Sequence, residues 1–405
     1  MKVSKIPPLI SAVSVSLFAM VYSAFAQTWT QTSAPPDFWS SIACSADGAR
    51  VVAVAGRGDL FYHPDWIFVS TNSRVTWRQT SAPTNYWRDV ASSSDGMDLV
   101  AVADTGPIYT STNGGLTWIS NNVPSLAWRS VASSADGKKL FAVTFFDQFF
   151  FTMNSGASWV SNSAPGGAWT IACSADGIKV VAAPGNYPGR ICTSTNSGTT
   201  WTTNDSPVAS WWSVASSADG SKLVAADGRG GPSGHVFTSS DAGVTWITNA
   251  LPLLSWQYVA SSADATKLIA AAWYSSGISS GPVFTSADSG TTWVSNNITS
   301  QSWECVASSA DGIKLYAATI AEGQGRVWTR QTTPSPHLTV LASADSLRLS
   351  WTVPSTNFVL QASPDLAAAS WSDVTNEPIL NLTNLEYEVT LPLMKSNRFY
   401  RLETP

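Results

Sequence analysis

"WRSVASSADG" (128–137) is the stretch that decides the fold, because the chain repeats it with small changes six more times. The other copies are WSSIACSADG (39–48), WRDVASSSDG (87–96), AWTIACSADG (168–177), WWSVASSADG (211–220), WQYVASSADA (256–265) and WECVASSADG (303–312). The aspartates recur at intervals of 40 to 48 residues. A period of this length, holding several short strands, is typical of propeller blades and not of helical solenoids.

A second phrase alternates with the first and predicts a fixed turn. Its copies are TSTNGGLTW (110–118), VSTNSRVTW (69–77), FTMNSGASW (151–159), TSTNSGTTW (193–201), TSSDAGVTW (238–246) and TSADSGTTW (285–293). We expect the Asn or Asp to accept backbone N–H bonds, the glycine to take positive φ and the tryptophan to cover the hairpin. A turn former tolerates an Asn-for-Asp exchange and a catalytic acid does not, so a structural role is predicted. These residues are Asn72, Asn113, Asn154, Asn196, Asp241, Asp288, Trp77, Trp118, Trp159, Trp201, Trp246 and Trp293.

The two ends of the repeat predict how it closes. Each unit holds four short apolar or β-branched runs, with no useful amphipathic helical period. The long phrase occurs seven times, but the complete short phrase occurs only six times. The beginning, QTWTQTSAPPDFW (27–39), matches the end of a unit. We therefore expect the segment around Trp29 to supply the outer strand of the seventh blade and to protect its edge.

The short phrase resembles the Asp-box, or BNR repeat, of sialidases, some endoglucanases and photosystem-assembly propellers. The resemblance covers residues 27 to about 333, although only Asp241 and Asp288 keep the acid and Arg74 replaces the usual glycine. It implies an all-β fold, a seven-bladed β-propeller over 27–333, either sialidase-like or similar to the photosystem II assembly and stability factor family.

Residues 336–405 differ in pattern from the repeat. Alternating strands without the short phrase predict a small β-sandwich, which resembles a fibronectin-type-III-like domain with Trp351 and Trp371 in its core. We expect it to act as a spacer or a surface-attachment module.

Residues 1–26 have the pattern of a cleaved secretory signal peptide. Lys2 and Lys5 precede an apolar run, and Ala24-Phe25-Ala26 precedes the expected cleavage after Ala26. No later stretch has the length of a membrane span. The mature protein is therefore expected to be secreted, periplasmic or on the cell surface, and monomeric.

Composition narrows the partners. Charged residues make up 12% of the chain and the net charge is −5, which argues against nucleic acid as a partner. The three His residues are scattered, so no zinc site and no cofactor are expected. Cys44, Cys173, Cys192 and Cys305 are interpreted as free thiols.

The residue after the repeated tryptophan position varies among the blades, although the register of the position is equivalent. It holds Ser40, Arg88, Arg129, Trp169, Trp212, Gln257 and Glu304. We expect it to face the same end as the variable loops, where binding residues concentrate on rigid scaffolds. Together with loop residues, it defines a candidate ligand site. The site comprises Arg57, Arg88, Arg129, Trp169, Trp212, Tyr187, Trp273, Tyr274 and Glu304.

Two functions remain open for this site. Arginines suit a carboxylate or sulfate, and aromatic rings suit a sugar or an apolar peptide. In the alternative interpretation these residues are structural: the rings fill space between blades, and the arginines pair with Glu304 and Asp89. The first hypothesis is a non-catalytic exported protein that binds an extracellular glycan or an envelope protein. The second is a glycoside hydrolase acting on extracellular polysaccharide, for which neither the sialidase "RIP" motif nor a distinct carboxylate pair is present in the sequence.

Overall fold

The structure is a computed structural model of the 405-residue chain. It describes residues 29–56, 65–72, 76–163, 166–185, 188–228, 233–273, 281–320, 325–331, 338–343, 345–352, 359–364, 371–381, 386–392 and 398–403. Every regular element in these ranges is a β-strand, and the same ranges hold no helix that could cross a membrane. The expected signal peptide lies outside them.

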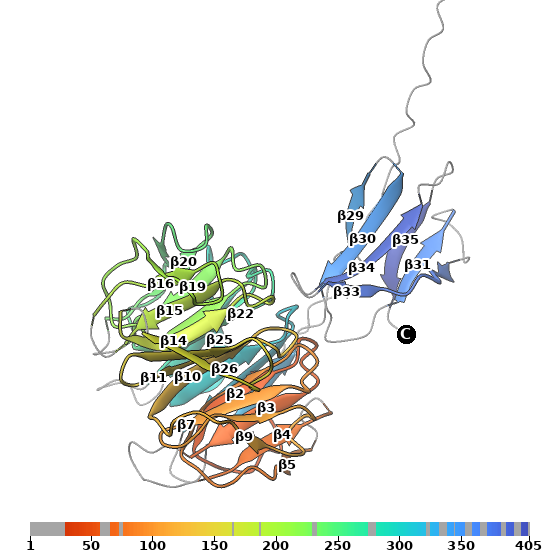
Figure 1. Cartoon of the computed structure of the whole chain (residues 1–405). Helices are drawn as coiled ribbons and strands as arrows, with labels where there is room; N and C mark the ends of the chain where they lie inside the picture. Colours follow the sequence, from red (N-terminus) through yellow and green to blue (C-terminus); the bar gives the residue numbers. More distant parts are fainter. Residues whose placement is uncertain are drawn as a thin grey trace, which may run out of the picture.

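Seven four-stranded antiparallel sheets form the larger body (Figure 1). The first contains β2 (Trp39–Cys44), β3 (Val51–Ala55), β4 (Ile67–Ser70) and β5 (Arg78–Gln79). The second contains β6 (Trp87–Ser92), β7 (Leu99–Ala103), β8 (Tyr109–Ser111) and β9 (Ile119–Ser120), and the third β10 (Trp128–Ser133), β11 (Leu140–Thr144), β12 (Gln148–Thr152) and β13 (Val160–Ser163). The fourth contains β14 (Ala168–Cys173), β15 (Val180–Pro184), β16 (Cys192–Ser194) and β17 (Thr202–Thr203).

The remaining sheets follow the same order. The fifth contains β18 (Ser213–Ser216), β19 (Leu223–Ala226), β20 (Val236–Ser239) and β21 (Ile247–Thr248). The sixth contains β22 (Trp256–Ser261), β23 (Leu268–Ala272), β24 (Gly281–Ser286) and β25 (Val294–Gln301). The seventh contains β26 (Trp303–Ser308), β27 (Lys314–Thr319), β28 (Val327–Gln331) and β1 (Thr30–Gln31).

The seventh sheet joins the two ends of the repeat, as the phase of the sequence predicted. Thr30 pairs with Thr329 and Gln31 with Trp328, so β1 is the outer strand beside β28. Trp29 is buried against the core shared by the sixth and seventh sheets. This pairing covers the outer edge of β28 and joins the first strand of the repeat to its last sheet.

A ring of backbone hydrogen bonds shows that the sheets surround one axis. The residue before each repeated aspartate donates its N–H to the equivalent carbonyl of the next blade, at 2.7 or 2.8 Å. The order is Ala46, Ser94, Ala135, Ala175, Ala218, Ala263, Ala310 and back to Ala46. Because the series returns to its first member, the propeller is closed.

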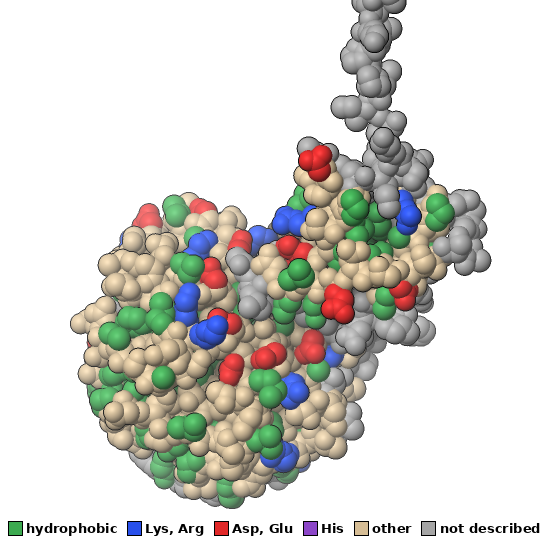
Figure 2. All heavy atoms as spheres, turned by 45° about the vertical axis from the view of Figure 1, so that its right-hand side comes forward, with side chains coloured by type: hydrophobic (Ala, Val, Ile, Leu, Met, Phe, Trp, Pro, Cys, Tyr) green, Lys and Arg blue, Asp and Glu red, His purple; other side chains and the backbone are tan. Residues whose placement is uncertain are grey.

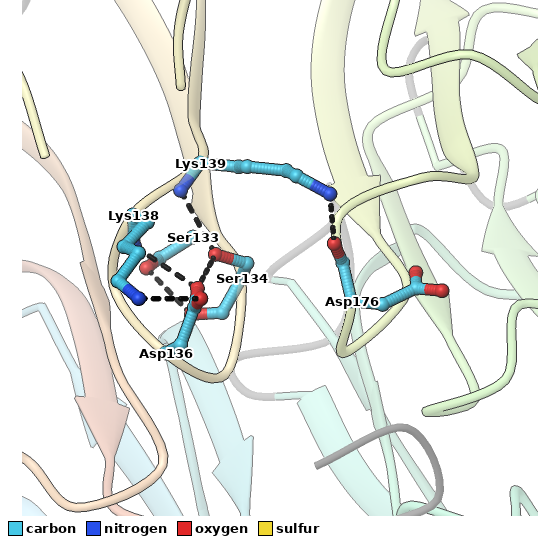
Figure 3. Close-up of polar contacts among 6 residues, drawn as sticks. All are labelled: Ser133, Ser134, Asp136, Lys138, Lys139 and Asp176. Carbon is cyan, nitrogen blue, oxygen red and sulfur yellow. Dashed lines mark hydrogen bonds and ion pairs between the residues drawn. The ribbon is translucent and has the colours of Figure 1, made fainter. Parts of the chain in front are cut away.

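The ring also changes the connection between the first two strands of each blade. Asp-Gly alone predicts a two-residue hairpin, but β2 ends at Cys44 and β3 begins at Val51. The longer connection is needed because Ala46 turns toward the axis to join the ring. The aspartate then holds the turn, as Asp136 does by accepting bonds from the Ser134 hydroxyl at 2.6 Å and the Lys138 N–H at 3.1 Å (Figure 3).

Lysines connect neighbouring turns in five places. In Figure 3, Lys139 reaches across to the fourth blade, where its Nζ donates to the Asp176 carbonyl at 2.6 Å. Equivalent bonds of 2.5 to 3.2 Å come from Lys179, Lys222, Lys267 and Lys314. The aspartate side chains of this phrase therefore shape the turns, and their backbone carbonyls accept the lysine bonds between blades.

The short phrase builds a second repeated turn on the outer hairpin. Asn113 accepts a bond from the Thr117 N–H at 2.9 Å, and all six copies have the equivalent bond at 2.8 to 3.0 Å. Gly115 has φ +81°, a conformation that other residues adopt only with strain. The closing tryptophans are half-buried against the blade cores. Asn and Asp make the same bond here, which explains why the sequence exchanges them.

Residues 338–403 contain the second body, a small β-sandwich. One sheet has the order β29 (Thr339–Ala342), β30 (Ser346–Thr352), β34 (Glu386–Pro392) and β33 (Ile379–Asn381). The other has the order β32 (Ser372–Asp373), β31 (Val359–Ser363) and β35 (Phe399–Glu403). Trp351 is buried in the core, whereas Trp371 is only half-buried.

Candidate functional site

The first strand of each blade lines a central channel with two cavities. One, which we name the loop-end cavity, has a volume of about 210 Å³ and lies where the variable loops meet. In six blades it is lined by the two residues that follow the repeated tryptophan position, and in the sixth blade by Tyr258 without Gln257. The other, the turn-end cavity, has a volume of about 180 Å³ and is lined by the Ser and Ala residues beside the closed ring.

Seven β-branched side chains, which we name the belt, stand between the cavities. They come from the fourth position of the long phrase and are Ile42, Val90, Val131, Ile171, Val214, Val259 and Val306. All seven line the loop-end cavity, and none of them lines the turn-end cavity. The channel is therefore divided into a variable, polar end and a uniform end of small residues.

Arg129 lines the loop-end cavity and lies against two neighbouring indole rings, whose centroids are 5.8 Å apart. Its guanidinium carbon lies 4.1 Å from the ring centroid of Trp169 and 5.3 Å from that of Trp212. The ring of Trp169 packs on Gly185, where an added Cβ would lie 2.4 Å from the indole. Cation–π contact with both rings fixes the direction of the guanidinium. Three consecutive blades thus hold one rigid group of hydrogen-bond donors.

Two exposed phenylalanines extend this cluster outward, and the sequence prediction did not include them. Phe145 lies 5.2 Å from Trp169 between ring centroids, and Phe146 lies 5.3 Å from Phe145. Phe146 is 73% exposed. The signal was present in "FFDQ" (145–148), where two aromatic residues occupy a hairpin turn beside the variable loops. The sequence pattern alone places them at the end of a strand.

The neighbouring arginine is held by an acid that the sequence did not pair with it. Arg88 forms an ion pair with Asp104, and neither side chain is fully exposed. Asp89 instead accepts bonds from the Ser41 and Ser130 hydroxyls and from the Val90 and Val131 N–H groups. Burial raises the pKa of Asp89, and these four bonds oppose the rise. Asp89 therefore joins the blades beneath Arg88.

The other predicted site residues are only partly brought together. Glu304 lines the loop-end cavity and is 5% exposed, so it is a buried acid and not a surface one. Gln257 is buried and donates to the Ser255 hydroxyl at 3.3 Å, without lining the cavity. Trp273 is half-buried and lies outside the cavity lining. Arg57, Tyr187 and Tyr274 are outside the described residues.

A buried pair of carboxyl groups lies on the same side as the variable loops. Asp37 is 8% exposed and Asp65 is 3% exposed, and their side chains share a hydrogen bond. Burial, followed by this bond and by the charge of Asp65, raises the pKa of Asp37 to about 8. The pair therefore holds a proton at neutral pH, at a cost to folding.

All four cysteines are free thiols in the described structure. Cys44 and Cys173, which occur in separate blades, both line the turn-end cavity. Burial raises the pKa of each of these two thiols to about 12. Among the described residues, no group of three His, Cys, Asp or Glu side chains has the arrangement of a metal site.

No family model matches the chain, and no curated protein matches it. Among solved structures, YCF48 from Cyanidioschyzon merolae is similar with a TM-score of 0.56 at 15% identity, over 75% of this chain and 98% of that one. A second structure, of YCF48 bound to D1 peptide, has a TM-score of 0.56 at 15% identity, over 79% of this chain and 98% of that one.

A hydrolase is also similar. The GH74 xyloglucanase from Xanthomonas campestris has a TM-score of 0.58 at 13% identity, over 80% of this chain. The matched region spans only 59% of that enzyme. Because a peptide-bound protein and a glycoside hydrolase share this architecture, the likeness establishes the β-propeller fold and leaves the function to the site.

Proposed function

We propose that this chain is an exported, non-catalytic binding protein that takes its ligand at the loop-end cavity. The observation that carries the proposal is the Arg129 guanidinium packed against both Trp169 and Trp212. A fixed guanidinium surrounded by rings is the kind of group that anchors ligands at protein interfaces. The signal-like pattern of residues 1–26 supports export.

Exposure of the rings favours a protein ligand over a glycan. Sugar stacking needs an accessible aromatic face, but Trp169 is 7% exposed and contacts Arg129 and Phe145. The exposed aromatic group is Phe146, and aromatic residues with arginine are enriched at protein interfaces. One of the similar solved propellers, YCF48, is bound to D1 peptide, which is consistent with a propeller that takes a peptide ligand.

The carboxylates of the cavity give less support to hydrolysis. A hydrolase needs two opposed carboxyl groups facing the substrate. Asp89 already accepts four hydrogen bonds from the scaffold, and Asp104 is paired with Arg88.

We also propose, from the six equivalent turn bonds and the two packed C-terminal sheets, that the repeat is an Asp-box and the sandwich fibronectin-type-III-like.

The proposal is tested by binding from the native envelope and by a glycan array, with wild type and Arg129→Ala compared. We expect saturable protein binding that weakens about tenfold or more in Arg129→Ala, the loss typical of an interface anchor. Lys138→Ala replaces an exposed side chain at the turn end of the propeller. It is the matched control and should bind like wild type. Release of sugar from polysaccharide, or equal binding by both variants, would contradict the proposal.

A further inference from the structure

The turn-end cavity has a feature that ligand binding at the loop end does not use. Beside it, the closed ring presents an apolar surface made of alanine methyl groups from five blades. These are Ala46, Ala175, Ala218, Ala263 and Ala310. On the other side of the cavity, the belt separates it from the loop-end cavity. Access from the turn end therefore depends on what covers the alanines.

Two residues of the sandwich cover them. Leu380 of β33 and Tyr387 of β34 pack against the alanine surface. The two residues are direct cross-strand partners, so their side chains leave the same face of the sheet. Next to them, Ile379 has the opposite orientation and is 75% exposed. One face of this short strand pair is thus buried by the propeller.

Tyr387 also belongs to the sandwich's own core. Its ring centroid lies 6.0 Å from that of Trp351, which is 3% exposed. The same side chain therefore contacts two hydrophobic clusters, one in each body. A spacer on a free linker would leave Leu380 and one side of Tyr387 in water, whereas in the docked arrangement both side chains are partly buried.

We propose that the sandwich is a docked cap over the turn end of the propeller channel, which restricts the entry of solutes from that end. Alanine suits this role because a larger side chain in the ring would push Leu380 and Tyr387 away. The cap covers the alanines of five blades on one side of the turn-end cavity, and the belt lies on the other side. This inference concerns the end of the channel opposite to the proposed binding site and does not depend on any ligand.

Cys44 and Cys173 make the cap measurable, since both thiols line the turn-end cavity. The full-length protein is treated with N-ethylmaleimide at one fixed pH, and labelling of each cysteine is followed by peptide mass spectrometry. We expect Leu380→Asp to raise the labelling rate of both thiols on the order of tenfold, as expected for loss of one buried leucine contact. Cys192, which lines neither cavity, is the internal reference and should not change.

Ile379→Asp is the matched control, because it adds the same charge to the exposed face of the same strand. It should label like wild type. Equal labelling in wild type and Leu380→Asp, or an equal increase in Ile379→Asp, would overturn the cap. If Leu380→Asp does not fold, Leu380→Ala should give a smaller increase in the same two thiols, and no increase would overturn the proposal. Small-angle scattering should also show a longer maximum dimension in the released variant.

Discussion

The two ends of the channel are built by the same seven strands and yet differ in nearly every respect. At the turn end, each blade contributes the same small residues because a closed ring needs seven equivalent backbone bonds. At the loop end, no such shared bond constrains the side chains, and one register position holds Ser40, Arg88, Arg129, Trp169, Trp212, Gln257 and Glu304. The repeated residues therefore close the ring of blades, and the variable position is where side chains can differ to bind a ligand.

The surface shown in Figure 2 carries charges of both signs. Acidic and basic side chains are interspersed on the face shown in Figure 2, without one large patch of either sign. Long-range attraction to a polyanion needs clustered positive charge. This face therefore offers no charged patch for such attraction.

The largest effect should come from removing a shared core residue. Trp211 is fully buried, and its Nε1 donates to the Gly189 carbonyl at 2.9 Å. We expect Trp211→Ala to lower the free energy of unfolding by about 3–5 kcal/mol, since a cavity replaces the indole. Urea unfolding measures this. Val208→Ala, at a 60% exposed position of the adjacent loop, should stay within about 0.5 kcal/mol. A small loss in Trp211→Ala would break the link between sameness and architecture.

At the loop end, one substitution should raise the free energy of unfolding instead of lowering it. The folded-state pKa of Asp37 is raised to about 8, so below about pH 4 both folded and unfolded chains hold the proton. As pH rises from 4 to 8, only the folded chain keeps it, and stability falls. Asp37→Asn should therefore be more stable than wild type near pH 8, by an amount on the order of a few kcal/mol.

Thermal unfolding of Asp37→Asn and wild type across pH 4 to 8 checks this expectation. The difference in Tm should widen with pH and level off above about 8. Asp205→Asn, which removes an exposed carboxylate, is the control and should give no such widening. A constant difference at all pH values would show that the buried pair does not hold the proton.

A smaller effect should separate the shape of the outer turn from its charge. Asn113 Oδ1 accepts the Thr117 N–H at 2.9 Å, and Asp makes the same bond in two other copies. Asn113→Ala should cost about 1 kcal/mol, the usual net value of one hydrogen bond. Asn113→Asp should change the free energy of unfolding by less than about 0.5 kcal/mol. Equal losses in both variants by urea unfolding would show that the amide has a role of its own.

Much of the fold was predictable because its determinants are local and repeated. The number of phrases and the match of the Trp29 segment to the end of a unit predicted the pairing of β1 with β28. The length of the turn after each first strand was not predictable, because it depends on bonds between blades that one unit does not reveal.

The candidate site was less predictable than the fold. Register alone placed Arg129, Trp169 and Trp212 together, since equivalent positions face one axis. The partner of Arg88 is Asp104, which lies on a loop whose path the repeat does not encode. Phe145 and Phe146 were missed because an apolar pair at a strand end has the same pattern whether it is buried or exposed.

The smallest effect on stability should be found where we expect one of the largest effects on binding. Phe146 is 73% exposed, and its ring touches Phe145 at the edge of the Arg129 cluster. Phe146→Ala should change the free energy of unfolding by less than about 0.5 kcal/mol, because little apolar area is buried there. The same change should weaken binding of the proposed protein ligand several-fold if the ring enters an interface. Ile247→Ala, at a 65% exposed position on the outer strand β21, is the matched control and should alter neither quantity.

Titration calorimetry and urea unfolding on the same samples separate the outcomes. Unchanged binding in Phe146→Ala would confine the ligand to the Arg129 cluster itself, whereas a large loss of stability would make Phe146 part of the scaffold.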